Sequence, residues 1–219
     1  MPHQYRAGVR GVALATAAYA LAIRPWQLRW GASVEEATGP VAGDDTIAEP
    51  DITATRAITI RTTAENVWPW IAQLGQGRGG LYSYDMLENL IGCDIHSADR
   101  IVPEWQDIAV GDQVRLHPEV GLAVAAVDRG RSLVLRGGVR MGDTPPPYDF
   151  TWVSELREHD GVTRLLVRER YAYSTWWAAL LVEPVEAVGF VMSKKMLRGI
   201  KDRAEGAGAA GARSKGGTT

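Results

Sequence analysis

Residues 174–204 read STWWAALLVEPVEAVGFVMSKKMLRGIKDRA, the longest helical pattern in the chain. The pattern predicts one helix over Trp176–Ala204, which would be about 43 Å long at 1.5 Å per residue. Its stripe of apolar side chains, which includes Met192 and Met196, must be buried against another layer of structure. Pro184 removes one backbone hydrogen bond and should bend the helix.

Upstream of this helix, short alternating segments bounded by glycine turns are typical of strands. Because the links between most of them are short, neighbouring strands should pair antiparallel. The predicted strands are Thr55–Arg61, Gln113–His117, Leu122–Val127, Ser132–Arg136, Tyr148–Arg157 and Thr163–Tyr173.

Two short helices are predicted between the first strand and the others. The stretch Thr62-Thr-Ala-Glu65 has the spacing of a capping box, and the helix after it should run to about Leu74 with Pro69 inside it. The second helix should cover Tyr84–Ile91.

These elements predict an α+β fold of the helix-grip kind. A curved antiparallel sheet of about six or seven strands would wrap around the long C-terminal helix, with two short helices after the first strand and an extra N-terminal helix. If the sheet curves more than the helix can fill, a cavity remains between them, and apolar ligands bind in cavities of that kind.

Composition excludes several classes of protein. With 24 Lys and Arg against 26 Asp and Glu, the net charge is −2, which argues against a nucleic-acid partner. One cysteine, Cys93, rules out an internal disulfide framework. Eight Trp and seven Tyr against two Phe suit pockets that join apolar walls to a few polar groups.

The chain divides into four predicted parts. Residues 1–23 hold an uncharged apolar run too short to span a membrane, since a spanning helix needs about 20 residues. That run is a packed helix, a membrane-surface helix that makes peripheral contact through residues 9–23, or a cleaved signal. An irregular linker (24–52), the main domain (53–205) and a disordered tail (206–219) follow. We expect a cytoplasmic protein. Whether it associates with a membrane, and whether it is a monomer or a homodimer, stays open.

Five segments carry a resemblance to a known family: Arg24–Gly31, Val67–Gly80, Tyr82–Asn89, Asp94–Glu104 and Lys195–Ile200. They resemble the START/polyketide-cyclase superfamily, often called SRPBCC, and within it a mainly actinobacterial branch. The resemblance covers about residues 24–204 and implies the helix-grip fold. Members of the superfamily bind sterols, phospholipids, polyketides and hormones, and only some are enzymes, so the resemblance implies no catalytic set.

Alternation predicts which strand residues face the cavity. Leu165, Val167, Glu169 and Tyr171 form the more apolar side of their strand, so Glu169 should point inward, where a carboxylate needs a partner or stays protonated. The alternative is that Glu169 pairs with Arg168 or Arg170 across a local twist. On the neighbouring strand the inner set should be Phe150, Trp152, Ser154 and Leu156. The predicted ligand-binding residues are Trp70, Tyr82, Tyr84, Asp85, Trp152 and Tyr171.

Three residues are candidate acid–base groups: Glu88, His96 and Glu169. Asp85 and Glu88 share a helix face, which either looks into the cavity or forms an ordinary polar surface. Neither a cofactor nor a metal is expected. The G-x-G-x-x-G of Gly75–Gly80 follows a helix instead of a strand, so it is predicted to be a turn.

The sequence therefore predicts a domain that binds a hydrophobic small molecule, such as a lipid, an isoprenoid or a polyketide-like compound. Two alternatives stay open. One is a cyclase or dehydratase that uses an acid–base residue and no redox cofactor, and the other is a lipid carrier adjacent to a membrane.

Overall fold

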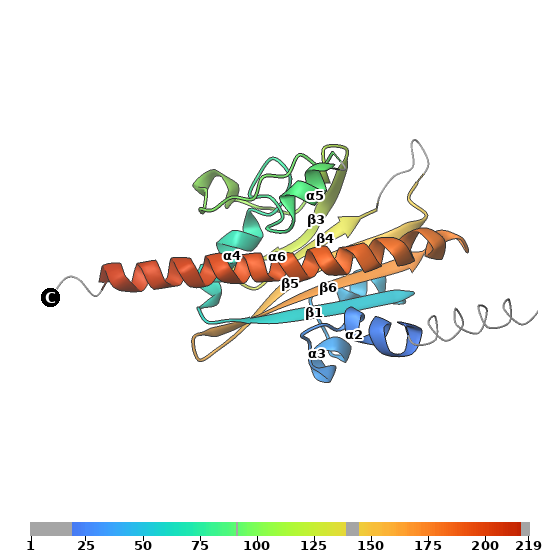
Figure 1. Ribbon diagram of the computed structural model, residues 1–219, viewed down its shortest axis with the longest axis horizontal. Helices are drawn as coiled ribbons and strands as arrows, with labels where there is room; N and C mark the ends of the chain where they lie inside the picture. Colours follow the sequence, from blue (N-terminus) through green and yellow to red (C-terminus); the bar gives the residue numbers. More distant parts are fainter. Residues whose placement is uncertain (1–18, 91, 139–144, 216–219) are drawn as a thin grey trace, which may run out of the picture.

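The computed structural model describes residues 19–90, 92–138 and 145–215. One six-stranded antiparallel sheet has the order β1-β6-β5-β4-β3-β2, and α6 (Ala178–Lys215) runs along one face of it (Figure 1). We call this the inner face. The predicted helix-grip fold is confirmed. The strands are β1 (Ile52–Ile60), β2 (Gln113–His117), β3 (Val120–Asp128), β4 (Ser132–Gly137), β5 (Tyr148–His159) and β6 (Val162–Tyr173).

The hairpin of β5 and β6 is the longest part of the sheet. Its register is unbroken from Tyr148 opposite Tyr173 to His159 opposite Val162. Asp160 and Gly161 connect the strands with φ angles of 51° and 73°, which matches the two-residue turn preferred by twisted hairpins.

The sheet is irregular toward its other edge. The pairing of β2 with β3 shifts between Arg115 and His117, and that of β3 with β4 shifts between Val124 and Ala126. Extra residues of this kind bend a strand and increase its twist.

Two short helices cover the inner face beside α6: α4 (Ala64–Ala72) and α5 (Asp85–Leu90). The predicted capping box does not form, because the helix begins one residue later, after Thr63, whose side chain makes no capping bond. Instead the Ala64 N–H donates to the Glu158 carboxylate of β5 at 2.7 Å.

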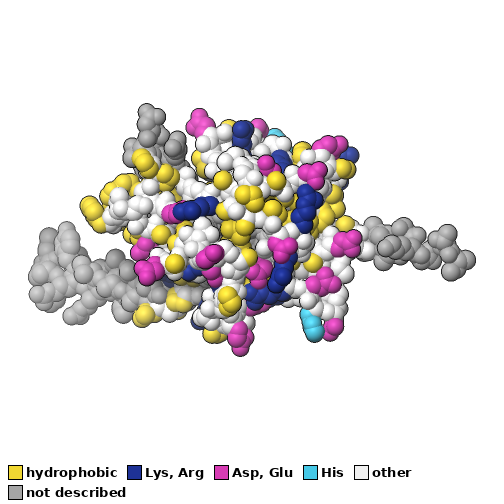
Figure 2. Space-filling view, turned by 180° about the vertical axis from the view of Figure 1, so that it is seen from behind, with side chains coloured by type: hydrophobic (Ala, Val, Ile, Leu, Met, Phe, Trp, Pro, Cys, Tyr) yellow, Lys and Arg dark blue, Asp and Glu magenta, His cyan; other side chains and the backbone are white. Residues whose placement is uncertain are grey.

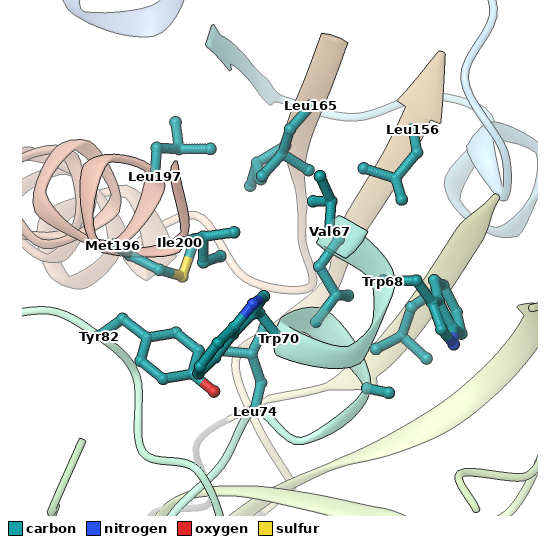
Figure 3. Packing of buried hydrophobic residues seen from close by; sticks show 14 of the residues in the cluster. Val67, Trp68, Trp70, Leu74, Tyr82, Leu156, Leu165, Met196, Leu197 and Ile200 are labelled. Atoms are coloured by element: carbon teal, nitrogen blue, oxygen red, sulfur yellow. The ribbon is translucent and has the colours of Figure 1, made fainter. Parts of the chain in front are cut away.

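The main core lies where α4, α6 and the inner face meet. Val67 and Trp70 of α4, Leu197 of α6 and Leu165 of β6 are almost completely buried there. Figure 3 shows side chains from the two helices converging on those of the strands. Leu165, Val167 and Leu156 belong to this core, as alternation predicted.

Residues 24–52 form α2 (Arg24–Leu28), α3 (Val34–Thr38) and a 3₁₀ turn, η2 (Asp44–Ile47), where an irregular segment was predicted. α2 contacts β1 and α6, whereas the residues from α3 to η2 cover the outer face of the sheet. Arg168 of β6 points into this layer and donates to the carbonyls of Glu36 and Gly39 at 2.8 and 3.0 Å. Seen from this side, acidic and basic side chains intermingle over the surface (Figure 2).

The two ends differ in how far the structure describes them. Residues 1–18, which hold most of the apolar run, lie outside the described residues, and η1 (Tyr19–Ile23) is one π-helical turn. At the other end, α6 continues past Gly206 to Lys215, where a tail was predicted. The alanines of this segment favour helix. No helix among the described residues is both long and apolar enough to cross a membrane.

Replacing Leu197 with alanine should lower the free energy of unfolding by about 3 kcal/mol, because it opens a cavity in the core. Leu180, on the same helix, is 75% exposed, and Leu180→Ala should change the free energy by less than about 0.5 kcal/mol. Urea unfolding followed by tryptophan fluorescence measures both. Equal effects would contradict the packing of α6 described above.

Candidate functional site

A cavity of about 160 Å³ lies between α6 and the inner face of β5 and β6. Its walls are mainly apolar and include Phe150 and Trp152 from the sheet and Met192 and Met196 from the helix. An engineered cavity of about 150 Å³ holds benzene, so this space suits one ring or an equivalent apolar group.

Gly189 leaves one part of the cavity wall without a side chain. It lies in the middle of α6 and lines the cavity, and a Cβ atom placed on it would meet nothing within 4 Å. Glycine inside a helix costs about 1 kcal/mol relative to alanine. The helix is therefore less stable at this position than it would be with alanine, and the position is one that lines the cavity.

Glu88 of α5 lines the cavity and is only 3% exposed. Neither of its carboxyl oxygens has a hydrogen-bond partner among the described residues. Burial, and secondly the charge of Asp85, raise the pKa of Glu88 from its ordinary 4.5 to about 7. The nearby Ser83 hydroxyl opposes this rise, although Ser83 donates to the Met192 carbonyl at 3.1 Å. Near neutral pH this carboxyl can therefore either give or take a proton.

Asp85 and Asn89 fix the helix that carries Glu88. The Asp85 carboxylate accepts bonds from the Ser97 N–H and hydroxyl at 2.7 and 2.6 Å. The Asn89 side chain pairs with the Ile95 backbone through two bonds of 2.8 and 2.6 Å. Asp85, predicted to bind ligand, is occupied by Ser97 and does not line the cavity.

Glu169 lies on the other wall and belongs to a buried ionic cluster. Arg56 of β1 is fully buried and donates to Glu169 at 3.0 Å and also to Glu186 of α6. Ser193 donates to Glu169 at 2.9 Å, and Gln27 of α2 donates to Glu186 at 2.8 Å. Burial raises the pKa of Glu186 above its ordinary value. Glu169 points inward as predicted, but its cationic partner is Arg56 and not Arg168 or Arg170.

Arg56 and Gly189 are the site residues that sequence reasoning missed. Arg56 shares the inner side of β1 with Ile58 and Ile60, so a charged residue on an apolar strand face was the available signal. A lone glycine amid a long helical pattern was the signal for the cavity.

The other predicted residues separate into two groups. Trp152 and Tyr171 line the cavity. Trp70 and Tyr82 lie in the core, with ring centroids 5.8 Å apart, and Tyr84 is 40% exposed.

His96 lies away from the cavity. Its side chain is 82% exposed and is 3.3 Å from Asp94. The loop that carries it turns Ile95 into the interior instead. Glu88 and Glu169 are therefore the two acid–base candidates that the fold brings to one cavity.

The glycine-rich segment forms a closed turn, in which Gly75 and Gly80 pair as an isolated bridge. Arg78 donates to the Ala72 and Trp105 carbonyls at 3.0 and 2.5 Å. Across the described ranges, no group of three or more His, Cys, Asp or Glu is placed to hold a metal ion.

No protein-family model and no curated protein matches the chain. Similar solved structures include protein Ms6760 from Mycobacterium smegmatis, with 18% identity and a TM-score of 0.38 over 68% of this chain and 88% of that one. CalU16 from Micromonospora echinospora has 16% identity and a TM-score of 0.35 over 72% and 86%. Hypothetical protein jhp0584 from Helicobacter pylori has 12% identity and a TM-score of 0.44 over 75% and 95%. A shared function does not follow from likeness at this level.

The raised pKa of Glu88 predicts a pH-dependent stability. The unfolded chain ionises this carboxyl near pH 4.5, whereas the folded protein keeps the proton until about pH 7, so stability is lost as the pH rises between these values. Relative to wild type, Glu88→Gln should therefore gain about 2 kcal/mol in free energy of unfolding between pH 5 and pH 8. Urea unfolding at both pH values measures this gain. Glu104→Gln, at an exposed carboxyl, should show none, and a pH-independent difference for Glu88→Gln would contradict a buried, unpaired carboxyl.

Arg56→Met should lower the free energy of unfolding by about 3–5 kcal/mol, because it leaves Glu169 and Glu186 buried without a cation. Adding Glu186→Gln should recover part of that loss. The control Arg129→Met breaks an exposed pair with Asp107 and should cost less than about 1 kcal/mol. Thermal or urea unfolding compares the variants, and similar losses for Arg56→Met and Arg129→Met would contradict a buried cluster.

Proposed function

We propose that this protein binds a small hydrophobic molecule in the cavity between α6 and the inner face of the sheet. The observation that carries this proposal is the cavity itself, which lies beside the main core and is walled by aromatic and methionine side chains. Cavities of this composition bind apolar ligands, and their few polar groups orient them. A lipid, isoprenoid or polyketide-like compound larger than one ring would place only part of itself inside.

Glu88 supports a second candidate, an enzyme of the cyclase or dehydratase type. A buried carboxyl with a pKa near 7 meets the requirement for general acid–base catalysis at neutral pH. The aromatic walls would hold the substrate in a folded shape beside it. This candidate requires chemical turnover as well as binding.

Exposed apolar residues support a third candidate, a lipid carrier adjacent to a membrane. Leu21, Trp176 and Leu180 are between 75% and 88% exposed. The Arg24–Glu183 ion pair joins the segment that follows Leu21 to the first turns of α6. Contact through residues 9–23 remains a prediction, because most of that run lies outside the described residues.

Filling the cavity should abolish binding without harming the fold. Gly189→Leu adds a side chain where the helix leaves open space, so binding should be lost while stability stays equal or rises. The probe is benzyl alcohol, and the readout is the methyl NMR signals of Met192 and Met196, which line the cavity. Gly206→Leu, a matched glycine in the same helix with equally open surroundings, should bind like wild type.

Two results would contradict the proposed function. One is the same saturable shift of both methionine signals in Gly189→Leu as in wild type, which would place the probe elsewhere. The other is no shift in wild type at saturating benzyl alcohol.

A further inference from the structure

The charged groups that line the cavity are all acidic. Glu88 and Glu169 lie on its two walls, and no Lys or Arg is among the described residues that line it. Arg56, the buried cation that bonds to Glu169, also pairs with Glu186. The cluster and the cavity wall together therefore hold three carboxyl groups and one guanidinium.

The lysines of α6 beside the cavity are directed elsewhere. The Lys194 ammonium lies 5.8 and 5.3 Å from the ring centres of Trp26 and Trp30. The Lys195 ammonium lies 5.9 Å from the ring centre of Tyr84. Neither lysine lines the cavity, and neither bonds to a Glu88 carboxyl oxygen.

The opposite wall is aromatic. The Phe150 and Tyr171 rings lie 4.6 Å apart, and Trp152 completes this side. Aromatic faces attract cations, with Trp and Tyr among the stronger attractors. A carboxyl without a partner and aromatic faces together have the chemistry of an ammonium site.

We infer that the cavity selects an apolar amine: a protonated amino group that pairs with Glu88, attached to an apolar body of about one ring that lies against Phe150, Trp152 and Tyr171. This inference rests on the proposed function, because it names the ligand class for the same cavity.

A cationic, a neutral and an anionic ligand differ in how well they satisfy the charge and the hydrogen bonds of Glu88. A buried carboxylate without a partner is costly, and an ammonium supplies both the opposite charge and the hydrogen-bond donors. A neutral alcohol brings no charge to pair with Glu88, so it gains only an ordinary hydrogen bond. A carboxylate ligand adds another negative charge to a site that already has an excess.

The test compares benzylamine, benzyl alcohol and benzoate, which share one ring and differ in charge. Titrations at pH 7.5, followed through the Met192 and Met196 methyl signals, should give benzylamine at least roughly tenfold tighter binding than benzyl alcohol, and benzoate the weakest. Glu88→Gln should remove most of the advantage of benzylamine over benzyl alcohol. Glu104→Gln, which makes the same change in net charge at an exposed site, should retain the advantage.

The outcomes separate the two proposals. If benzyl alcohol or benzoate binds in the cavity as tightly as benzylamine, the amine inference is wrong and the binding function stands. The inference is also wrong if Glu88→Gln keeps the full preference for benzylamine. If none of the three compounds moves the methionine signals, the proposed function itself fails, and the inference falls with it.

Discussion

The buried ionic cluster of Arg56, Glu169 and Glu186 fixes how separate parts of the chain meet. It joins β1, β6 and α6, and the hydrogen bond from Gln27 to Glu186 adds α2. Burying these charges in water-free surroundings is costly, so each needs its partners in place. The strands, the long helix and the N-terminal segment must therefore come together in one arrangement.

This cluster divides α6 into two regions with different packing. From Met196 to Ala204 the buried side chains of the helix are apolar and pack against the sheet and α4. Around Glu186 and Ser193 the contact is polar, and Gly189 lies between these two residues with no side chain. The cavity lies where dry packing gives way to the ionic cluster, so its position follows from the order of residues along one helix.

Most of the fold could be predicted from the sequence, because the alternation of the strands and the apolar stripe of the long helix were both clear. The alternation in β5 and β6 separated inner from outer residues correctly, and it placed Glu169, Trp152 and Tyr171 at the cavity. It could not name the partner of Glu169, since Arg56 is distant in the chain and is brought near only by the pairing of β1 with β6. The layer over the outer face was missed for a related reason. Its short helices have little periodicity, and Arg168 holds the layer through backbone carbonyls, which no side-chain pattern reveals.

The pairing of α2 with α6 has a mechanical consequence. Arg24 binds Glu183 and Gln27 binds Glu186, so two residues one turn apart on α2 grip two residues one turn apart on α6. The next residues of α6 toward its C-terminus include Gly189 and Met192, which form the cavity wall. A shift of α2 would therefore act on α6 directly before the residues that form the cavity wall.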